Sequence, residues 1–458
     1  MATVALICAS LPGWVPAPVH AATNTTDSTD TTVKGRPLVQ YPPRRPLPVR
    51  AEADYALRAA PIDVAARGEI GLERRGAATA PTDAPTPPRE SRPAQTSPPS
   101  PRPVSPATEV HTIALLLPMT GPLASAAHAV RDGFMAALFR APSPRPKLVF
   151  IDSSAQGIDT AYRDALAAGA QFIVGPLDRS ELTKLNMAGN LAVPTLALNY
   201  LPAGSAVTAN LYQFGLAPED EAREVAERAF ADGHQAVLIV TMRADWAQRA
   251  SGAFAERWSQ LGGQVLDRVV VVAQGEIEKQ VKAALLIPEG QARWAAVAQA
   301  LAFNPQFRER YRRDIDAIVL FARPGFAGTV NATLKYHFAE QLPVYATSHV
   351  YGAGDGSAND LNGIRFCDTP WHLQGDPLRT QLRAAFPKAS GDQANLYALG
   401  VDAFNLQSQL KTLLAARTAR VNGATGTLSI GGSARIAREL SWAAFVNGAA
   451  RPIANESR

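Results

Sequence analysis

Short continuous apolar runs alternate with amphipathic segments from about residue 111 to about residue 453. The run Thr112–Pro118 is apolar at nearly every position, which is typical of a strand buried on both faces of a sheet. The segment that follows, Ser125–Arg140, repeats its apolar residues at helical spacing. Repetition of this pair predicts β-α-β units, and therefore a parallel sheet with helices on both faces.

The alternation forms two successive units. Further elements of the first unit are expected at Lys147–Asp152, Asp159–Ala168, Gln171–Val174, Asp178–Gly189 and Pro194–Asn199. The second unit begins after Leu216 with a helix at Pro218–Ala231, whose acidic first turn suits the positive end of a helix dipole. It ends with a strand at Pro343–Thr347 and contains an extra segment, Glu289–Arg313, that we expect to be helical.

The chain then returns through a strand at Asn362–Asp368, a long helix at Asn395–Ala416 and a hairpin-like close over 421–446. This order predicts an α/β fold of two lobes linked by several crossings, each lobe a parallel sheet flanked by helices. We place lobe 1 at about 111–216 and 348–458, and lobe 2 at about 217–347.

Residues 22–108 differ in composition from everything that follows. Of the 36 prolines in the chain, 16 lie between Pro37 and Pro106, and no apolar period is visible there. A segment of this kind buries too little apolar surface to offset the entropy lost on ordering. We therefore expect 22–108 to be disordered and the folded domain to occupy 109–458, which is long enough for two lobes.

Residues 1–21 contain an apolar segment, Val4–Ala9, and end in Val19-His20-Ala21, which resembles a signal-peptidase site. This pattern predicts export to the periplasm. Cleavage would remove Cys8 and leave Cys367 alone, so no intramolecular disulfide is expected. Ile7 precedes Cys8 where lipid attachment favours a small residue, so a lipid anchor is not evident in the sequence. No later run approaches the roughly 18 apolar residues of a membrane span.

The formal net charge of +5 does not indicate nucleic-acid binding. Residues 22–108 contain 12 Lys/Arg and 9 Asp/Glu, which leaves 33 and 31 for the remainder of the chain. A nearly neutral globular part, without a basic run interleaved with aromatic residues, is not typical of a phosphate-binding surface.

Seven stretches, spread in order from about Thr112 to Pro452, resemble those of one known family. They are Ile113–Gly121, Ile173–Leu177, Leu196–Asn199, Leu216–Arg223, Tyr397–Ala403, Asn422–Leu428 and Leu440–Trp442. Together they resemble the penicillin-binding-protein activator family (LppC/LpoA-like), whose C-terminal domain has the type I periplasmic-binding-protein fold. A single stretch would be weak, since strand-plus-loop patterns recur in this superfold, but the ordered set is more specific.

The resemblance implies a non-enzymatic envelope protein that binds and activates a class A penicillin-binding protein, a peptidoglycan synthase, without a cofactor. It also implies a periplasmic location associated with the outer membrane, and peptidoglycan is a second candidate partner. The alternative is a periplasmic solute-binding receptor for a transporter or sensor. A carboxylate-binding loop after the third strand would favour the receptor.

Ligands of open parallel sheets bind beyond the carboxyl ends of the strands. The candidate cleft residues in the corresponding loops are Thr120, Gly121, Ser125, Gly175, Pro176, Leu177 and Asn199. In the third-strand loop, Pro176 lacks an N–H and Leu177 offers no polar group, so this loop is poorly suited to hold a carboxylate. We expect the cleft to be vestigial or closed, with a small polar ligand as the alternative.

Other motifs carry little chemistry. Ser408-Gln-Leu-Lys411 matches the Ser-x-x-Lys of penicillin-recognising enzymes, but it lacks the companion motifs and lies inside a predicted helix, so we interpret it as a chance match. The Gly/Asp-rich stretch Tyr351–Gly363 fits no EF-hand spacing and is interpreted as a flexible connection. No His-Glu-x-x-His motif or Cys/His cluster is found, so neither a metal site nor a catalytic set is expected.

Four arginines near Tyr311 form a dense basic patch: Arg308, Arg310, Arg312 and Arg313. A solvated helix face is the simpler interpretation. The other is a surface that steers an acidic partner, or anionic peptidoglycan, toward the domain.

Overall fold

The computed structural model describes residues 110–454 except 302, 304, 353–357, 387–388, 390 and 392. The predicted signal peptide, the Pro-rich segment 22–108 and the centre of the Gly/Asp-rich stretch lie outside the described residues. Within the described part of the chain, no helix is both long and apolar enough to cross a bilayer.

The first lobe is built on five parallel strands in the order β2-β1-β3-β4-β5. The strands are β1 (Thr112–Leu117), β2 (Lys147–Asp152), β3 (Phe172–Val174), β4 (Thr195–Ala197) and β5 (Leu211–Gln213). Apolar side chains of β1 alternate between two cores: Leu115 packs with α1 (Ala124–Arg140) and Leu116 with α3 (Ile158–Ala167). Both faces of β1 are therefore buried, as its continuous apolar run predicts.

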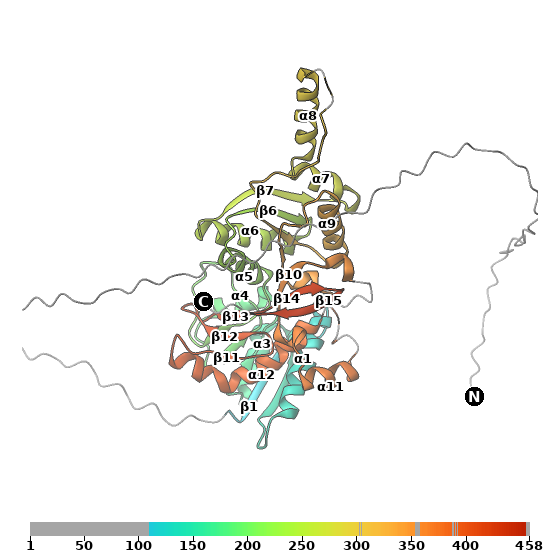
Figure 1. Cartoon of the computed structure of the whole chain (residues 1–458). Coiled ribbons are helices and arrows are strands. Elements are labelled where there is room, and N and C mark those ends of the chain that lie inside the picture. Colours follow the sequence, from blue (N-terminus) through green and yellow to red (C-terminus); the bar gives the residue numbers. More distant parts are fainter. Residues whose placement is uncertain are drawn as a thin grey trace, which may run out of the picture. The chain divides into compact units, whose positions relative to one another are not determined.

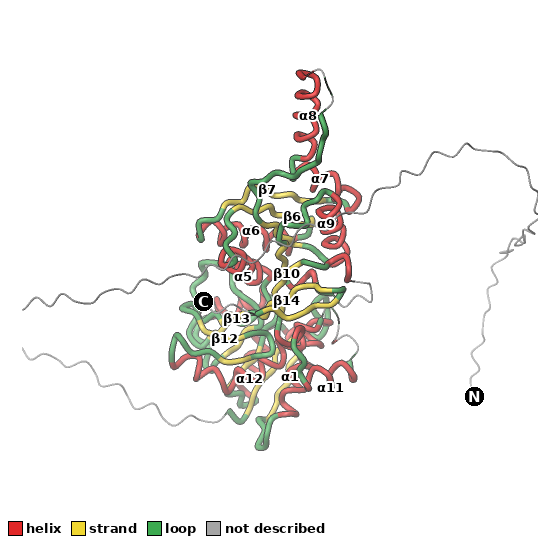
Figure 2. Tube along the Cα trace, in the orientation of Figure 1, coloured by secondary structure: helices red, strands yellow, loops and turns green. Residues whose placement is uncertain are grey.

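The second lobe contains a seven-stranded sheet in the order β15-β14-β10-β9-β8-β6-β7. Its strands are β6 (Ala236–Met242), β7 (Gln264–Val271), β8 (Ala317–Phe321), β9 (Val344–Ala346), β10 (Ile364–Asp368), β14 (Ser441–Val446) and β15 (Ala449–Ile453). The strands β6 to β10 are parallel, while β14 and β15 add an antiparallel edge. Figure 2 shows the strands in yellow between red helices.

Helices cover both faces of the second sheet. The helices α5 (Pro218–Ala231) and α6 (Asp245–Gln260) share one core with it, and α7 (Ile277–Ala284) and α9 (Pro324–Tyr336) share the other. In the first lobe, α4 (Arg179–Ala188) packs in the same core as α3, and the short helix α2 (Ser153–Gln156) contacts α3.

The described chain crosses between the lobes three times: after β5, after β10 and after β13 (Ile436–Glu439). This corrects the expected lobe boundaries, because 348–458 does not belong to lobe 1 as a whole. The strands β10, β14 and β15 join the second sheet, whereas α12 (Ala394–Ala415) packs in the first lobe. The first lobe also receives α10 (Pro370–Leu373), α11 (Pro377–Ala385), β11 (Val421–Asn422) and β12 (Thr427–Ile430). The expected hairpin over 421–446 is thus a β12–β13 hairpin, after which the chain crosses and enters β14.

Two glycines bring α1 and α12 into backbone contact. A Cβ on Gly400 would lie 2.0 Å from the carbonyl oxygen of Val130, and a Cβ on Gly133 would lie 2.1 Å from that of Tyr397. No side chain larger than hydrogen fits at these two positions. The return helix α12 is therefore seated directly against the first helix of lobe 1 (Figure 1).

The segment expected to be helical over Glu289–Arg313 is helical only in its first half. Helix α8 (Ile287–Leu301) ends before Pro305, and the described residues 305–312 have no helix. Proline inside a helix lacks the required N–H and clashes with the preceding turn, so Pro305 accounts for this end. Figure 1 shows α8 standing away from the second sheet.

Candidate functional site

The residues expected to form a ligand cleft lie at the carboxyl ends of β1, β3 and β4. Thr120 and Gly121 follow β1, Ser125 lies in the first turn of α1, Gly175–Leu177 follow β3, and Asn199 follows β4. The topology therefore brings them to one edge of the first sheet, but the hydrogen bonds that they form are with other groups of the protein.

The loop after β1 is bonded to the loop after β2. Thr120 Oγ1 donates to Ser154 Oγ at 2.9 Å, and Asp152 Oδ1 accepts the Met119 N–H at 3.0 Å. The Met119 N–H, with Ser154, lowers the pKa of the Asp152 carboxyl. Ser125 Oγ accepts from Gln393 Nε2 at 2.6 Å, so this hydroxyl is also engaged.

The loop after β3 is bonded to β4 and to the loop that follows β4. The Gly175 N–H donates to Leu196 O at 2.8 Å, and the Pro176 carbonyl accepts the Leu198 N–H at 2.9 Å. Leu177 is buried in the core, and its carbonyl accepts from Asn199 Nδ2 at 2.9 Å. Asn199 Oδ1 in turn accepts the Tyr200 N–H. These groups hold the first lobe together, and a carboxylate ligand would have to displace such bonds.

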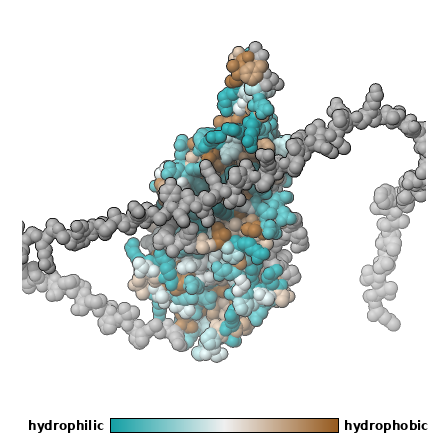
Figure 3. All heavy atoms as spheres, in the orientation of Figure 1, coloured by the Kyte–Doolittle hydropathy of each residue, from teal (hydrophilic) through white to brown (hydrophobic). Residues whose placement is uncertain are grey.

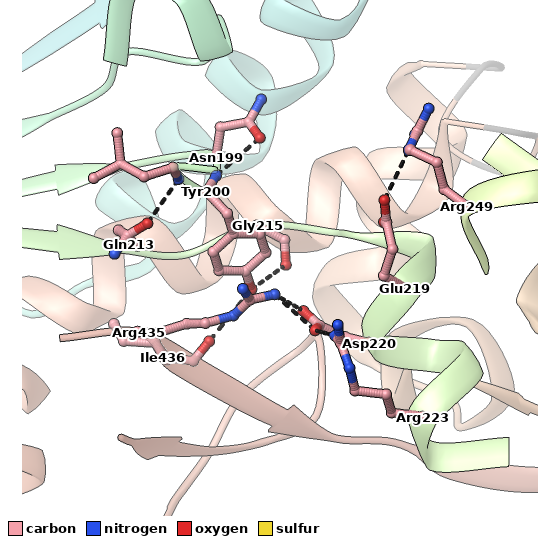
Figure 4. A network of polar contacts seen from close by, with 11 residues as sticks. Asn199, Tyr200, Gln213, Gly215, Glu219, Asp220, Arg223, Arg249, Arg435 and Ile436 are labelled. Carbon is pink, nitrogen blue, oxygen red and sulfur yellow. Dashed lines mark hydrogen bonds and ion pairs between the residues drawn. The ribbon is translucent and has the colours of Figure 1, made fainter. Parts of the chain in front are cut away.

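Three consecutive acids at the start of α5 face different partners around the junction of the lobes. Glu219 accepts from Arg249 Nε at 2.7 Å, within the second lobe. Asp220 binds Arg435 of the first lobe, whose Nη2 lies 2.7 Å from each carboxylate oxygen. Glu221 is buried and accepts from the Ser348 N–H and hydroxyl. Figure 4 shows the Glu219 and Asp220 contacts.

The guanidinium of Arg435 also lies over the ring of Tyr200, 3.6 Å from its centroid. Tyr200 is buried, and its hydroxyl donates to Gly215 O at 3.1 Å, beside the first crossing (Figure 4). Burial raises the pKa of the Tyr200 hydroxyl, so it stays a neutral donor. Arg435 is therefore held between the Asp220 carboxylate and the face of the Tyr200 ring. Because Asp220 belongs to the second lobe and Arg435 and Tyr200 to the first, this network links the two lobes.

Further carboxyl groups near the crossings have raised pKa values. Burial raises the pKa of Glu224 to about 8, and Glu224 Oε1 accepts the Leu440 N–H at 3.1 Å at the third crossing. Burial likewise raises the pKa of Asp402 to about 6, and Asp402 accepts from Ala424, Thr425 N and Thr425 Oγ1. Raised pKa values can mark acid–base catalysts, but each of these carboxyls is bonded to the backbone of a crossing or turn. We assign them a structural role.

A metal site, a cysteine nucleophile and a reactive serine find little support in the described part of the chain. No group of three or more His, Cys, Asp or Glu residues that could hold a metal ion is present among the residues that the structure describes. Cys367 is buried, and burial raises the pKa of its thiol well above the ordinary value, so it is not a nucleophile. Ser408 lies within α12, where its hydroxyl donates to Asn405 O.

The four arginines of the basic patch lie in the non-helical segment that follows α8, not on a helix. Arg308, Arg310 and Arg313 are exposed and line a hollow of about 500 Å³ together with Tyr311 and Phe338. Arg312 differs, because it forms a two-pronged ion pair with Asp314 at 2.7 and 2.6 Å. Three arginines of the patch are thus exposed, and the fourth, Arg312, is paired with Asp314.

Sequence reasoning missed two features of this surface and of the junction. In the junction network, Arg435 binds Asp220, and the Tyr200 hydroxyl lies near Ile436 O, 236 positions further along the chain. No local sequence pattern indicates contacts between residues so far apart. The sequence predicts a helix over Glu289–Arg313, but it does not indicate that Val297 and Leu301 on α8, and Phe303 just after it, are exposed. Their exposure depends on what packs around α8, which the sequence pattern does not show.

Two lobes with central parallel sheets and three crossings define the type I periplasmic-binding-protein fold. The chain belongs to the LppC family, because the family model described as "LppC putative lipoprotein" matches residues 106–448.

Relatives and solved structures agree with this assignment. The "Penicillin-binding protein activator LpoA" of Photobacterium profundum is 28% identical over 352 residues, which cover 76% of this chain and 57% of that protein. The chain thus spans a little over half the length of this curated relative. The "LpoA (YraM) C-domain from Haemophilus influenzae, a regulator of PBP1A" matches 75% of this chain and 100% of its own, with 25% identity and a TM-score of 0.60. A "putative branched-chain amino acid ABC transporter" from Chromobacterium violaceum matches 73% and 99%, with 28% identity and a TM-score of 0.55.

Proposed function

We propose that this protein is a non-enzymatic component of the cell envelope that binds and activates a class A penicillin-binding protein, a peptidoglycan synthase. The observation that carries the proposal is the family match over residues 106–448, which coincides with the two-lobed domain. The relatives that match this same domain are named penicillin-binding protein activators. The proposed location is the periplasm, in association with the outer membrane.

The geometry of the cleft supports a role through protein contacts. Two donors of the loops that would hold a small ligand are bonded within lobe 1: the Gly175 N–H to Leu196 O, and Asn199 Nδ2 to Leu177 O. The Asp220–Arg435 ion pair links the two lobes directly. A solute receptor, by contrast, needs free donors at these loops and lobes that open and close.

A solute-binding receptor is the second candidate, favoured by the likeness to the Chromobacterium violaceum structure described as a putative amino-acid transporter component. The two functions differ in what the cleft must do. A receptor is stabilised by its solute, whereas an activator is recognised by its effect on a synthase.

The deciding experiment combines the purified protein with each class A penicillin-binding protein of the same organism. We expect saturable binding and an increased rate of peptide cross-linking on lipid-linked substrate, with no cross-linking by the protein alone. Bovine serum albumin at equal concentration serves as the control for non-specific stimulation. Absence of binding to every class A synthase, together with unchanged cross-linking rates, would overturn the proposal.

A further inference from the structure

Helix α8 and the segment that returns from it form a projection that we call the arm, which comprises the described residues 287–301, 303 and 305–313. Although α8 is rich in apolar residues, only Ile287 at its start is buried. The two halves of the arm are held together by Trp294, whose Nε1 donates to Pro305 O at 3.0 Å and whose ring lies 5.3 Å from that of Phe307. The arm is therefore an organised element with its own internal contacts.

The base of the arm is attached to the second lobe by polar contacts. Glu309 Oε1 lies 2.5 Å from Nδ1 of the buried His337, and Gln291 Nε2 donates to Glu309 Oε2 at 3.3 Å. The Arg312 N–H donates to Leu285 O at 3.0 Å. The one acidic side chain of the described returning segment before Asp314, Glu309, is therefore used to attach the arm to the second lobe.

The end of the arm is apolar. Val297, Leu301 and Phe303 are 49%, 52% and 61% exposed. Figure 3 shows brown, hydrophobic side chains gathered at the end of this projection. Contiguous apolar residues on an organised projection are unfavourable in water, and they are typical of a surface that another molecule covers.

Three cations lie at the base of the arm, beside the start of α8. Arg308, Arg310 and Arg313 are exposed, and no ion pair or side-chain hydrogen bond joins them to any residue that the structure describes. A partner that covers the arm from its tip to its base would meet these cations, and carboxylates on that partner would complement them. A helix that inserts into an apolar groove is an established mode of protein recognition.

We propose that the arm is the docking element for a protein that presents an apolar groove bordered by carboxylates. This inference rests on the proposed function, which makes the periplasmic part of the class A synthase that protein. An anionic membrane is the less suitable occupant, because the exposed side of α8 carries several alanines and Gln299 and few large apolar groups. Alanines permit the close approach of a groove wall but add little to insertion into lipid.

Two variants of the full chain test the docking role. The tip variant, Leu301→Ser with Phe303→Ser, removes apolar contacts, and we expect its Kd for the synthase to rise at least tenfold. The base variant, Arg308→Gln with Arg310→Gln and Arg313→Gln, removes charge, and we expect roughly three- to tenfold slower association with a weaker salt dependence. Neither set lies in the core, so the melting temperature of both variants should stay close to that of the unmodified protein.

Matched controls change the same chemistry elsewhere. Phe139→Ser with Met187→Ser replaces exposed apolar residues of lobe 1, which are 63% and 80% exposed. Arg163→Gln with Arg417→Gln and Arg451→Gln removes three exposed charges away from the arm. We expect these controls to change the Kd less than twofold. Surface plasmon resonance at two salt concentrations measures all five proteins against the immobilised synthase.

The outcomes separate the two proposals. If the unmodified protein binds the synthase and the tip variant binds equally well, the docking role of the arm is wrong and the proposed function stands. If the unmodified protein binds no class A synthase, the proposed function fails and this inference fails with it. If the tip residues are instead needed for sedimentation with phosphatidylglycerol vesicles, or for dimerisation in analytical ultracentrifugation, while synthase binding does not depend on them, the occupant is a membrane or a second copy and the inference is overturned.

Discussion

Arg435 Nη2 lies 2.7 Å from both carboxylate oxygens of Asp220, although 215 positions separate the two residues along the chain. Asp220 begins helix α5 of the second lobe, and Arg435 lies in the β12–β13 turn of the first. The pair stands next to Tyr200, whose hydroxyl bonds to Gly215 at the first crossing. One ion pair thus ties together two of the places where the chain passes between lobes.

Replacement of Asp220 by Asn should loosen this junction. Both side chains are about one-third exposed or less, so solvent screens the pair only partly, and we expect a loss of about 1 kcal/mol in the free energy of unfolding. Chemical denaturation measures this loss. Hydrogen exchange should also become faster in the backbone around residues 436–441.

Glu219→Gln is the matched control for Asp220→Asn. It removes a neighbouring charge from the same helix start, but its ion pair with Arg249 lies within the second lobe. We expect a similar or smaller loss of stability without faster exchange at the crossing. Equal exchange rates in the two variants would contradict a role for Asp220 in joining the lobes.

Gly400→Ala should destabilise the protein by about 1–3 kcal/mol, because the added Cβ would lie 2.0 Å from the Val130 carbonyl and force α12 away from α1. Gly252→Ala, within α6, is the control. A Cβ there meets no atom within 4 Å, so the higher helix propensity of alanine should stabilise the protein by about 0.5–1 kcal/mol. Thermal unfolding of both variants would show opposite shifts, and shifts of the same sign would refute the proposed close contact.

Glu224 makes stability depend on pH. Burial raises its pKa to about 8 in the folded protein, against about 4.3 for an unfolded chain. Between these values the folded state binds more protons than the unfolded state, so the contribution of Glu224 to stability falls as pH rises from about 4 to about 8.

Glu224→Gln removes this dependence and keeps an oxygen for the Leu440 N–H. At pH 8 the variant should be more stable than the unmodified protein by about 1–2 kcal/mol, allowing for partial solvent access, and the difference should vanish near pH 4. Urea denaturation across this range measures it. Parallel stability curves for the two proteins would show that the Glu224 pKa is not raised.

No free amino acid should stabilise the domain, because donors of the cleft loops such as the Gly175 N–H and Asn199 Nδ2 are already bonded within the protein. A ligand at 100 times its Kd would add about 2.7 kcal/mol to the free energy of unfolding, which a thermal shift assay detects easily. The measurement is a titration with common amino acids and small peptides, and an unchanged melting temperature is the expected result. A clear rise in melting temperature with any of them would favour the solute-receptor function.

The periodicity of apolar residues was sufficient to predict most of the folded elements. The buried run Thr112–Pro118 became β1, and the helices expected at Asp178–Gly189 and Asn395–Ala416 are α4 and α12 within one residue at each end. The resemblance carried by stretches such as Ile173–Leu177 led to the LppC family, which the family match confirms. These signals are readable because strand and helix periods, and short motifs, are properties of neighbouring residues.

Three features were decided only by the tertiary structure: the division of the return segment between two sheets, the Asp220–Arg435 pair, and the exposure of Leu301 on the arm. Each depends on which elements become neighbours in space. The apolar side chains of β14 could be buried in either sheet. Those of α8 could be buried in the core of the protein or against a partner. Burial and charge pairing are properties of the packed chain, so a local pattern can specify that a face is apolar but not what covers it.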